Sequence, residues 1–334
     1  MTTISAAAGS ADLETVRHAV AEYCDNPSGF LALNDGNSYF SLPDVPGVIV
    51  YRASGPFLVQ FGGPLAPAEA AGRLLDGFLG LAAAQQRAVV AIQVQQGETG
   101  LYVDHGFTVN QVGASYALDL AGFTLKGTRF MQLRNKIARA FRAGLTVTES
   151  SLDECADAVA AVDRAWLGSK GEHAKPLEFL VGQLDGPVQA ERRLFLGRIE
   201  GRPVGYISYS PAHGSRPGWL HDLSRRLPDK VPGIMEAINK TAIETFIAEG
   251  VPWLHFGFTP FTGLSAEHEA PGASKGYAWF MRWLLENGAA IYPAQTQLAY
   301  KNKWAPVILP EYVAFHGRAR LSGLLHVFKA ANAV

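Results

Sequence analysis

The sequence has few cysteines and no long apolar run. Its 334 residues include two cysteines, Cys24 and Cys155, which lie far apart. They form neither a disulfide framework nor a Cys-x-x-Cys pair, so we expect a reducing compartment. The longest apolar candidate, residues 74–84, contains an Asp and two glycines and falls short of the about 18 residues that a membrane helix needs. A basic segment followed by an apolar one is also missing at the start, so we expect a cytoplasmic protein without a transmembrane segment.

Positive charge is concentrated in one segment of an otherwise balanced chain. The 29 lysines and arginines nearly match the 30 acids, and 48% of the residues are hydrophobic, as in a folded protein. Residues 128–144, TRFMQLRNKIARAFRAG, contain no acid. Their five basic residues are Arg129, Arg134, Lys136, Arg139 and Arg142. On a helical wheel these residues lie mostly opposite an apolar face, which predicts an amphipathic helix that ends at Gly144.

Three surroundings would suit this basic face: RNA phosphates, an anionic membrane surface or plain solvent. A surface helix ordinarily mixes charges of both signs, whereas this one carries a single sign. A tRNA acceptor stem presents repeated phosphates that match a row of basic side chains. We therefore favour RNA binding by the five basic residues and keep the other two as alternatives.

The expected elements follow a similar order in the two halves of the chain. Each half shows a helix, antiparallel strands and then alternating helices and strands, which predicts an α+β fold with mixed, mainly antiparallel sheets. We predict one domain over residues 11–145 and a second over residues 146–330. In the second half we expect strands over residues 218–226 and 252–258, a strand and turn over 290–306, and a closing amphipathic helix with a basic margin after residue 317.

Several motifs resemble the catalytic domain of the aminoacyl-phosphatidylglycerol synthases, also called multiple peptide resistance factors. In the second half and just before it they are LRNKIARAFRAG, WLHDLSRRLPDKVPGIMEAI, LHFGFTP and YKNKWAPVILPEY; in the first half they are ALNDGNSYF, GVIVYR, FGGPLAP, YVDHGF and ALDLAGFTLKG. The resemblance covers about residues 28–316. It implies two tandem GNAT-like acyltransferase domains and transfer of an aminoacyl group from the 3′ end of a tRNA to a nucleophile.

The resemblance also implies where the chemistry takes place. An aminoacyl-tRNA ester is already activated, so the enzyme positions it, helps the nucleophile to lose a proton and stabilises an oxyanion, without metal or organic cofactor. The motif HDLSRR places Asp222 and Arg225 in the active site. Asp222 would bind the α-ammonium group or hold a base, and Arg225 would bind the terminal adenosine phosphate. The alternative from the residues alone is a surface ion pair.

Two lysines in the motif YKNKW are the candidates for oxyanion stabilisation. Lys301 and Lys303 would share one face if the segment were a strand, and a lysine beside the reacting carbonyl stabilises negative charge. Which lysine acts stays open, and solvated lysines at a strand edge are the alternative. His221 is expected on the opposite side of its strand from Asp222, in a structural role. The polar loop at residues 169–175 is a candidate for selecting the acceptor.

The sequence therefore predicts an aminoacyl-tRNA-dependent aminoacyltransferase whose partners are a charged tRNA and a small amine, hydroxylamine or hydroxyl acceptor. Because the large membrane half of the lipid-modifying family members has no counterpart in this sequence, we favour specialised-metabolite or antibiotic biosynthesis. Aminoacylation of phosphatidylglycerol or another lipid, with peripheral contact to an anionic membrane, is the first alternative. An acyl-CoA-dependent acetyltransferase is the second, although neither residues 61–72 nor 225–238 match the required glycine-rich pyrophosphate loop. The third is a binding module without activity.

Overall fold

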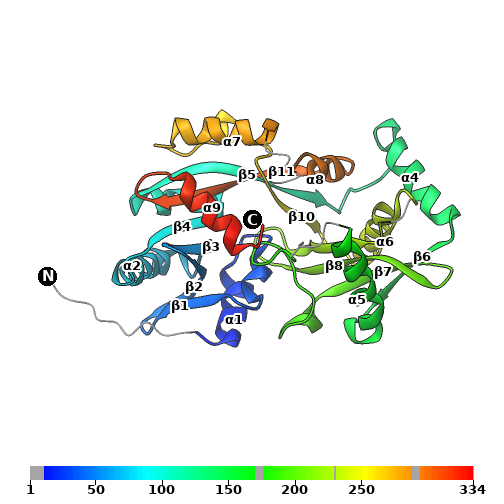
Figure 1. The fold of residues 1–334 in the computed structure, drawn as a ribbon, viewed down its shortest axis with the longest axis horizontal. Helices are drawn as coiled ribbons and strands as arrows, with labels where there is room; N and C mark the ends of the chain where they lie inside the picture. The colour runs from blue at the N-terminus through cyan, green and yellow to red at the C-terminus, as the bar shows by residue number, and fades with distance from the viewer. Residues whose placement is uncertain (1–10, 170–175, 229–230, 288–293, 334) are drawn as a thin grey trace.

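A computed structural model of the chain describes residues 11–169, 176–228, 231–287 and 294–333. Across these ranges eleven strands form one sheet in the order β1-β2-β3-β4-β11-β5-β10-β9-β8-β7-β6 (Figure 1). The strands are β1 (Ser38–Leu42), β2 (Val45–Ser54), β3 (Phe57–Leu65), β4 (Ala88–Gln95), β5 (Phe107–Asp119), β6 (Leu145–Ser150), β7 (Arg193–Ile199), β8 (Arg202–Ala212), β9 (Gly218–Arg226), β10 (Trp253–Pro260) and β11 (Val307–His316). The helices are α1 (Leu13–Tyr23), α2 (Ala68–Ala84), α3 (Thr99–Asp104), α4 (Met131–Arg142), α5 (Leu152–Gly168), α6 (Ile234–Ala248), α7 (Lys275–Asn287), α8 (Ala294–Asn302) and α9 (Leu321–Ala330).

The sheet is mainly antiparallel. Only β3 with β4 and β9 with β10 run parallel among the described strands, one such pair in each half of the chain. The predicted α+β class with mixed, mainly antiparallel strands is confirmed. The predicted glycine stop is also confirmed, because Gly144 takes a positive φ of 86° just after α4. Ser151 and Glu154 form a reciprocal capping box at the start of α5.

The end of the chain completes the first half of the sheet. β11 lies between β4 and β5 and pairs antiparallel with both, and β5 pairs with β10 of the second half. α9 then packs against β2 and β3. The division into residues 11–145 and 146–330 stays a prediction, and the strand pairing shows that residues 307–330 pack with elements of the first half.

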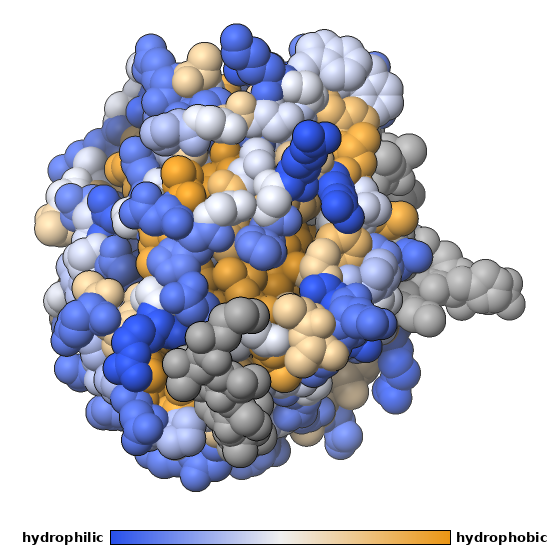
Figure 2. Space-filling model, turned by 90° about the vertical axis from the view of Figure 1, so that its left-hand side faces the viewer, coloured by the Kyte–Doolittle hydropathy of each residue, from blue (hydrophilic) through white to orange (hydrophobic). Residues whose placement is uncertain are grey.

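Helices cover both faces of the sheet. On the part of the sheet formed by β1–β4, β11 and β5, one face is covered by α1, α7 and α9, which share a core cluster with alternate strand residues. The opposite face of that part is covered by α2 and α3, which share a second cluster. In the second half α4 and α6 cover one face and α5 the other. Figure 2 views the molecule from the left-hand side of Figure 1 and shows apolar surface between hydrophilic side chains. None of the helices in the described ranges is long and apolar enough to cross a bilayer.

The basic segment forms the predicted helix, α4, with Leu133, Ile137 and Ala140 buried. Phe141, in the last turn of the same helix, is 39% exposed. The strand predicted over residues 290–306 is wrong in its described part, because residues 294–302 form helix α8. Its Ala, Gln, Leu and Lys residues favour a helix, and Thr296 is its one β-branched residue. Residues 290–293 lie outside the described ranges.

Candidate active site

The site begins where two parallel strands diverge. β9 and β10 pair over three residues each, from Gly218 with Trp253 to Leu220 with His255, and then each strand continues beside its other neighbour. A cavity of about 660 Å³ lies at this divergence. Its walls come from β9, β10, the end of α8, the inner face of α9 and residues 177–181. Backbone carbonyls at the gap have other partners, because Asp222 accepts from the amide of Gly182 and Gly257 accepts from Lys301.

Both strands carry a bulge at the point of divergence. On β9, His221 and Leu223 pair with two adjacent residues of β8, so Asp222 between them is the extra residue of the bulge. On β10, His255 and Gly257 pair with two adjacent residues of β5, so Phe256 is the extra residue of a second bulge. His221, Asp222 and Arg225 all contribute to the cavity lining. The ring of His221 lies against Tyr209, whereas Asp222 interacts with Ser208 and Ser210, which flank Tyr209 on β8, so His221 and Asp222 point to opposite sides of β9 as expected.

Asp222 is a buried carboxylate paired with an arginine that the sequence did not single out. Its Oδ2 lies 3.4 Å from Nε of Arg192, and neither side chain is exposed. The same guanidinium donates to Oδ1 of Asn34 at 2.8 Å and lies 5.1 Å from the ring centre of Phe30. The alternative of a surface ion pair between Asp222 and Arg225 is therefore wrong, because the partner is Arg192 and the pair is buried.

Burial raises the pKa of Asp222 to about 6. Arg192 and the hydroxyls of Ser208 and Ser210 counteract part of that rise. The Oδ1 atom of Asp222 accepts no hydrogen bond from the residues that the structure describes. The carboxylate has no exposed surface and lies against Gly182, where an added Cβ would be 2.5 Å from Cγ of Asp222. A carboxyl group with a pKa of about 6 can accept a proton from a group that reaches it.

Arg225 lies at the side of the same cavity. Its guanidinium carbon is 3.9 Å from the ring centre of Trp166, which is stacking contact, and Nε lies 4.0 Å from Oδ1 of Asp163. Burial lowers the pKa of Arg225. An arginine stacked on an aromatic face keeps the edge of its planar fork available for an anion. The arrangement is compatible with the predicted contact to a phosphate.

Lys301 is buried at the β10 bulge. Its Nζ donates to the carbonyl of Gly257 and to Oγ1 of Thr259, each at 2.7 Å, and to the carbonyl of Phe258 at 3.2 Å. Burial lowers the pKa of Lys301 to about 7, and the neighbouring Glu311 counteracts part of this fall. The ammonium group is thus held in place at the cavity wall, and its longest hydrogen bond is the one that a substrate oxygen could replace.

Lys303 does not share this environment. Its Nζ pairs with Oε1 of Glu236 at 2.8 Å, and it is not among the residues that line the cavity. The shared face expected for a strand is absent, because Lys301 lies in the last turn of helix α8 and Lys303 follows the end of that helix. Residues two apart on a helix point in directions about 200° apart.

Two further ionisable groups lie near Lys301: His221, which the sequence analysis assigned a structural role, and Glu311, which it missed. Burial, with Lys301, lowers the pKa of His221 to about 3, so the ring is neutral, and its Nδ1 has no hydrogen bond within the described residues. Glu311 of β11 is fully buried, accepts a hydrogen bond from Ser115, and has its pKa raised by burial to about 7. No local signal in the sequence marks Glu311, because β11 reaches the site through long-range strand insertion.

The predicted RNA-binding helix lies at the end of the molecule opposite α2 (Figure 1). Arg134 bonds to the carbonyls of Leu125 and Gly127 at 2.5 and 2.7 Å, and Arg142 bonds to the carbonyl of Ala138 at 3.3 Å. The guanidinium of Arg129 lies over the ring of Phe130 at 5.8 Å. Lys136 and Arg139 are exposed, and their side chains have no hydrogen bond or ion pair within the described residues. α4 packs on α6, whose Met235 lines the cavity.

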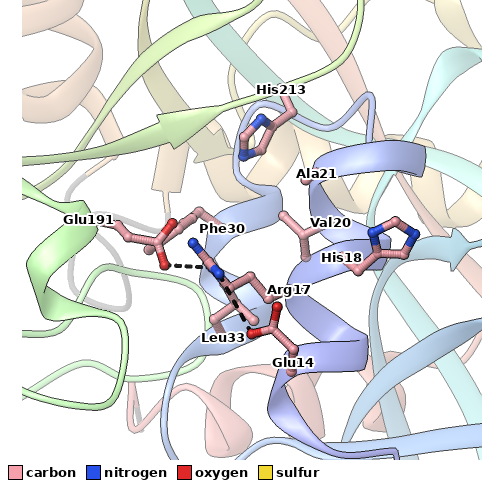
Figure 3. Close-up of a pocket in the computed structure, with 9 residues that line it drawn as sticks. All are labelled: Glu14, Arg17, His18, Val20, Ala21, Phe30, Leu33, Glu191 and His213. Carbon is pink, nitrogen blue, oxygen red and sulfur yellow. Dashed lines mark hydrogen bonds and ion pairs between the residues drawn. The ribbon is translucent and has the colours of Figure 1, made fainter.

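A second, smaller cavity lies between α1 and the second half (Figure 3). It measures about 310 Å³. Arg17 lies between two acids there, 2.9 Å from Glu191 and 3.6 Å from Glu14, and the rings of His18 and His213 lie on different sides of it. The cavity contains none of the predicted residues.

No three His, Cys, Asp or Glu side chains in the described ranges lie close enough to hold a metal ion. The loop at residues 169–175, the candidate for selecting the acceptor, lies outside the described residues apart from Ser169.

Comparisons with known proteins agree on one family. The family model described as phosphatidylglycerol lysyltransferase, C-terminal, matches residues 17–315. The phosphatidylglycerol lysyltransferase of Bacillus subtilis is 24% identical over 294 residues, which is 87% of this chain and 33% of that protein. A lysylphosphatidylglycerol biosynthesis bifunctional protein LysX, from Rhodococcus opacus, is 24% identical over 89% of this chain and 27% of its own length. The chain thus spans about a third or less of these curated relatives.

Solved structures share the fold. The C-terminal domain of a putative lysylphosphatidylglycerol synthetase from Agrobacterium fabrum superposes with a TM-score of 0.78 at 19% identity, over 96% of this chain and 98% of that one. L-PGS from Bacillus licheniformis gives a TM-score of 0.78 at 21% identity, over 96% and 95%. FemX superposes with a TM-score of 0.53 at 10% identity, over 92% of this chain and 96% of the FemX chain.

Proposed function

Because this chain belongs to the family of phosphatidylglycerol lysyltransferase C-terminal domains, we propose that it moves an aminoacyl group from a charged tRNA to a headgroup hydroxyl of phosphatidylglycerol. The sequence alone favoured a small-molecule acceptor, and the names of the relatives favour its lipid alternative instead. The observation that carries the proposal is the cavity between β9 and β10, where Asp222, Arg225 and Lys301 meet in a chain that matches the family over residues 17–315.

The lining of the cavity supports a lipid acceptor. One wall is polar and holds the three candidate residues on β9 and α8. Apolar side chains line the cavity too, and they come from the segment before β7 and from the inner face of α9: Leu177, Leu180, Val181, Leu324, Val327 and Phe328. A phospholipid needs both, because its headgroup carries the reacting hydroxyl and its chains require apolar contact.

The proposed reaction assigns one role to each candidate. Arg225 binds a phosphate at the tRNA terminus. Asp222 accepts the proton of the lipid hydroxyl as its oxygen attacks the aminoacyl carbonyl carbon. Lys301 stabilises the resulting oxyanion. When the intermediate collapses, the bond to the ribose oxygen breaks, that oxygen takes the proton from Asp222, and a new ester to the lipid remains.

A transfer assay tests this function. The purified chain is incubated with radiolabelled aminoacyl-tRNA, lysyl-tRNA first, and with phosphatidylglycerol vesicles or a set of small amines and hydroxylamines. The proposal expects label in the lipid phase that RNase treatment abolishes. Label that appears only in a water-soluble product would restore the small-molecule acceptor. A protein that transfers nothing in an RNase-sensitive way would contradict both.

The free basic residues of α4 provide the first mutational prediction. We propose that Lys136 and Arg139 contact the tRNA backbone, so Lys136→Gln with Arg139→Gln should raise KM for aminoacyl-tRNA and leave kcat nearly unchanged. The slope of log affinity against log salt should become less steep by about 0.7–0.9 for each lost contact. Arg73→Gln with Arg87→Gln, which removes equal charge from α2 and its end, is the control. An unchanged salt slope in the α4 variant would show that this face does not bind the tRNA.

Arg192 provides the second mutational prediction. We propose that it keeps Asp222 ionised, so Arg192→Gln should raise the pKa of Asp222 by about 1 or more. The acidic limb of the kcat/KM profile would move to higher pH by the same amount, because more Asp222 is protonated at any given pH. Arg193→Gln is the matched control, since Arg193 pairs with Glu149 and Glu249 away from the cavity. Equal profiles for the two variants would exclude this positioning role.

A further inference from the structure

The outer faces of α7 and α9 expose large apolar side chains. Trp279 and Trp283, one helical turn apart on α7, are 65% and 42% exposed. Leu321 and Leu325, one turn apart on α9, are 50% and 45% exposed. We propose that these two faces together, called the α7–α9 face below, bind an anionic lipid bilayer. This inference rests on the proposed function, because it names the surface through which the enzyme reaches a lipid acceptor.

The two helices are neighbours on one face of the sheet. The ring of Tyr277 on the buried side of α7 lies 5.2 Å from that of Phe315 in β11, centre to centre. Gly323 of α9 packs so closely on the same ring that an added Cβ would lie 2.7 Å from it. Their buried residues belong to one core cluster, so their exposed residues point outward on the same side of the sheet.

The charges around these apolar residues are complementary to anionic lipid. Over the described residues 275–287 and 317–333 there are five basic side chains, Lys275, Arg282, Arg318, Arg320 and Lys329, and Glu286 is the one acid. The chain as a whole is nearly neutral. Exposed tryptophan and leucine flanked by lysine and arginine are typical of a surface that inserts shallowly into an anionic interface. A second copy of the chain fits less well, because two such faces would bring like charges together.

The position of α9 connects this surface to the site. Its outer residues Leu321 and Leu325 are exposed, while its inner residues Leu324, Val327 and Phe328 line the cavity. A lipid lifted from a bilayer under the α7–α9 face would therefore pass along α9 toward Lys301 and Asp222. The exposed apolar residues and the apolar wall of the cavity belong to the same helix.

Flotation with vesicles tests the proposal. Vesicles of equal parts phosphatidylglycerol and phosphatidylcholine should bind the wild-type chain, and phosphatidylcholine vesicles should bind it at least about ten-fold more weakly, since each basic residue near an anionic surface contributes about five-fold in affinity. Trp279→Ser with Trp283→Ser, and separately Arg318→Gln with Arg320→Gln, should each weaken binding about ten-fold or more. Met131→Ser with Ile247→Ser removes two exposed apolar side chains from the second half and serves as the matched control.

Activity measurements separate this inference from the proposed function. With short-chain phosphatidylglycerol dissolved as monomers, the α7–α9 variants should transfer label as fast as wild type, and with vesicles they should be at least about ten-fold slower. Variants that bind and modify vesicles like wild type would overturn the inference and leave the function intact. Loss of vesicle binding in Lys136→Gln with Arg139→Gln, rather than in the α7–α9 variants, would overturn it in favour of α4. Loss of tRNA binding in the α7–α9 variants, with vesicle binding kept, would assign the face to RNA. Absence of transfer to either form of the lipid would refute the function itself.

Discussion

Lys301→Arg is expected to lower kcat/KM for aminoacyl transfer by about 10²- to 10³-fold, the usual effect of losing one oxyanion-stabilising group. The ammonium of Lys301 fits among three acceptors at 2.7, 2.7 and 3.2 Å, and the larger planar guanidinium does not match that arrangement. Because the pKa of Lys301 is lowered to about 7, the wild-type rate should fall as the pH rises through about 7 and the lysine loses its charge. Arginine stays protonated throughout, so the residual activity of the variant should lack that alkaline limb. Single-turnover transfer measured across pH checks both effects.

A lysine-to-arginine substitution at Lys303, two residues after Lys301, is the control for this prediction. Lys303→Arg keeps a cation beside Glu236 and lies outside the cavity lining, so its kcat/KM should stay close to that of wild type. Thermal unfolding of both variants shows whether either merely fails to fold. A folded Lys301→Arg enzyme with full activity, or with an unchanged alkaline limb, would remove Lys301 from the mechanism.

Asp222→Asn is expected to lower kcat by about 10²- to 10⁴-fold, the range for loss of a general base. The pKa of Asp222 is raised to about 6, so the carboxylate is charged above pH 6 and protonated below it. The wild-type rate should therefore rise as the pH increases through about 6, and with the alkaline limb of Lys301 the optimum falls between about 6 and 7. Asparagine keeps the shape and a hydrogen-bonding oxygen for Arg192 but cannot accept the proton, so the acidic limb should disappear. The dependence of kcat on pH checks this.

Asp163→Asn is the control for this prediction. Asp163 is also a partly buried carboxylate whose pKa is raised by burial, and it is not among the residues that line the cavity. Its variant should keep the acidic limb. If Asp222→Asn instead raises KM for aminoacyl-tRNA and leaves kcat unchanged, Asp222 binds the α-ammonium group and is not the base.

The sequence predicted those parts of the fold that local periodicity determines. The basic helix and its glycine stop each depend on residues a few positions apart, and both are present. The grouping of Asp222, Arg225 and Lys301 came from a family resemblance and not from spacing, since Lys301 lies 79 positions after Asp222 in the numbering of the chain. The cavity lining now shows these three residues together.

Other features depend on long-range contacts that local patterns do not encode. The insertion of β11 between β4 and β5 brings Glu311 to Lys301, and nothing in the segment itself indicates its strand neighbours. Arg192 and Arg193 are adjacent and look alike in the sequence, yet one is buried on Asp222 and the other lies between Glu149 and Glu249. The bulge at Asp222 likewise arises from the register with β8, which the sequence of β9 alone does not show.

The central claim is that the aminoacyl end of the tRNA reacts in the gap between β9 and β10. A structure of the chain with a stable 3′-aminoacylamino-adenosine phosphate, in which an amide replaces the ester, tests it most directly. The account predicts the amide carbonyl oxygen about 3 Å from Nζ of Lys301, the phosphate on Arg225 and the free oxygen of Asp222 facing the carbonyl carbon. An analogue seated in the smaller cavity beside Arg17, or on the surface of α4, with the gap between β9 and β10 unoccupied, would contradict it.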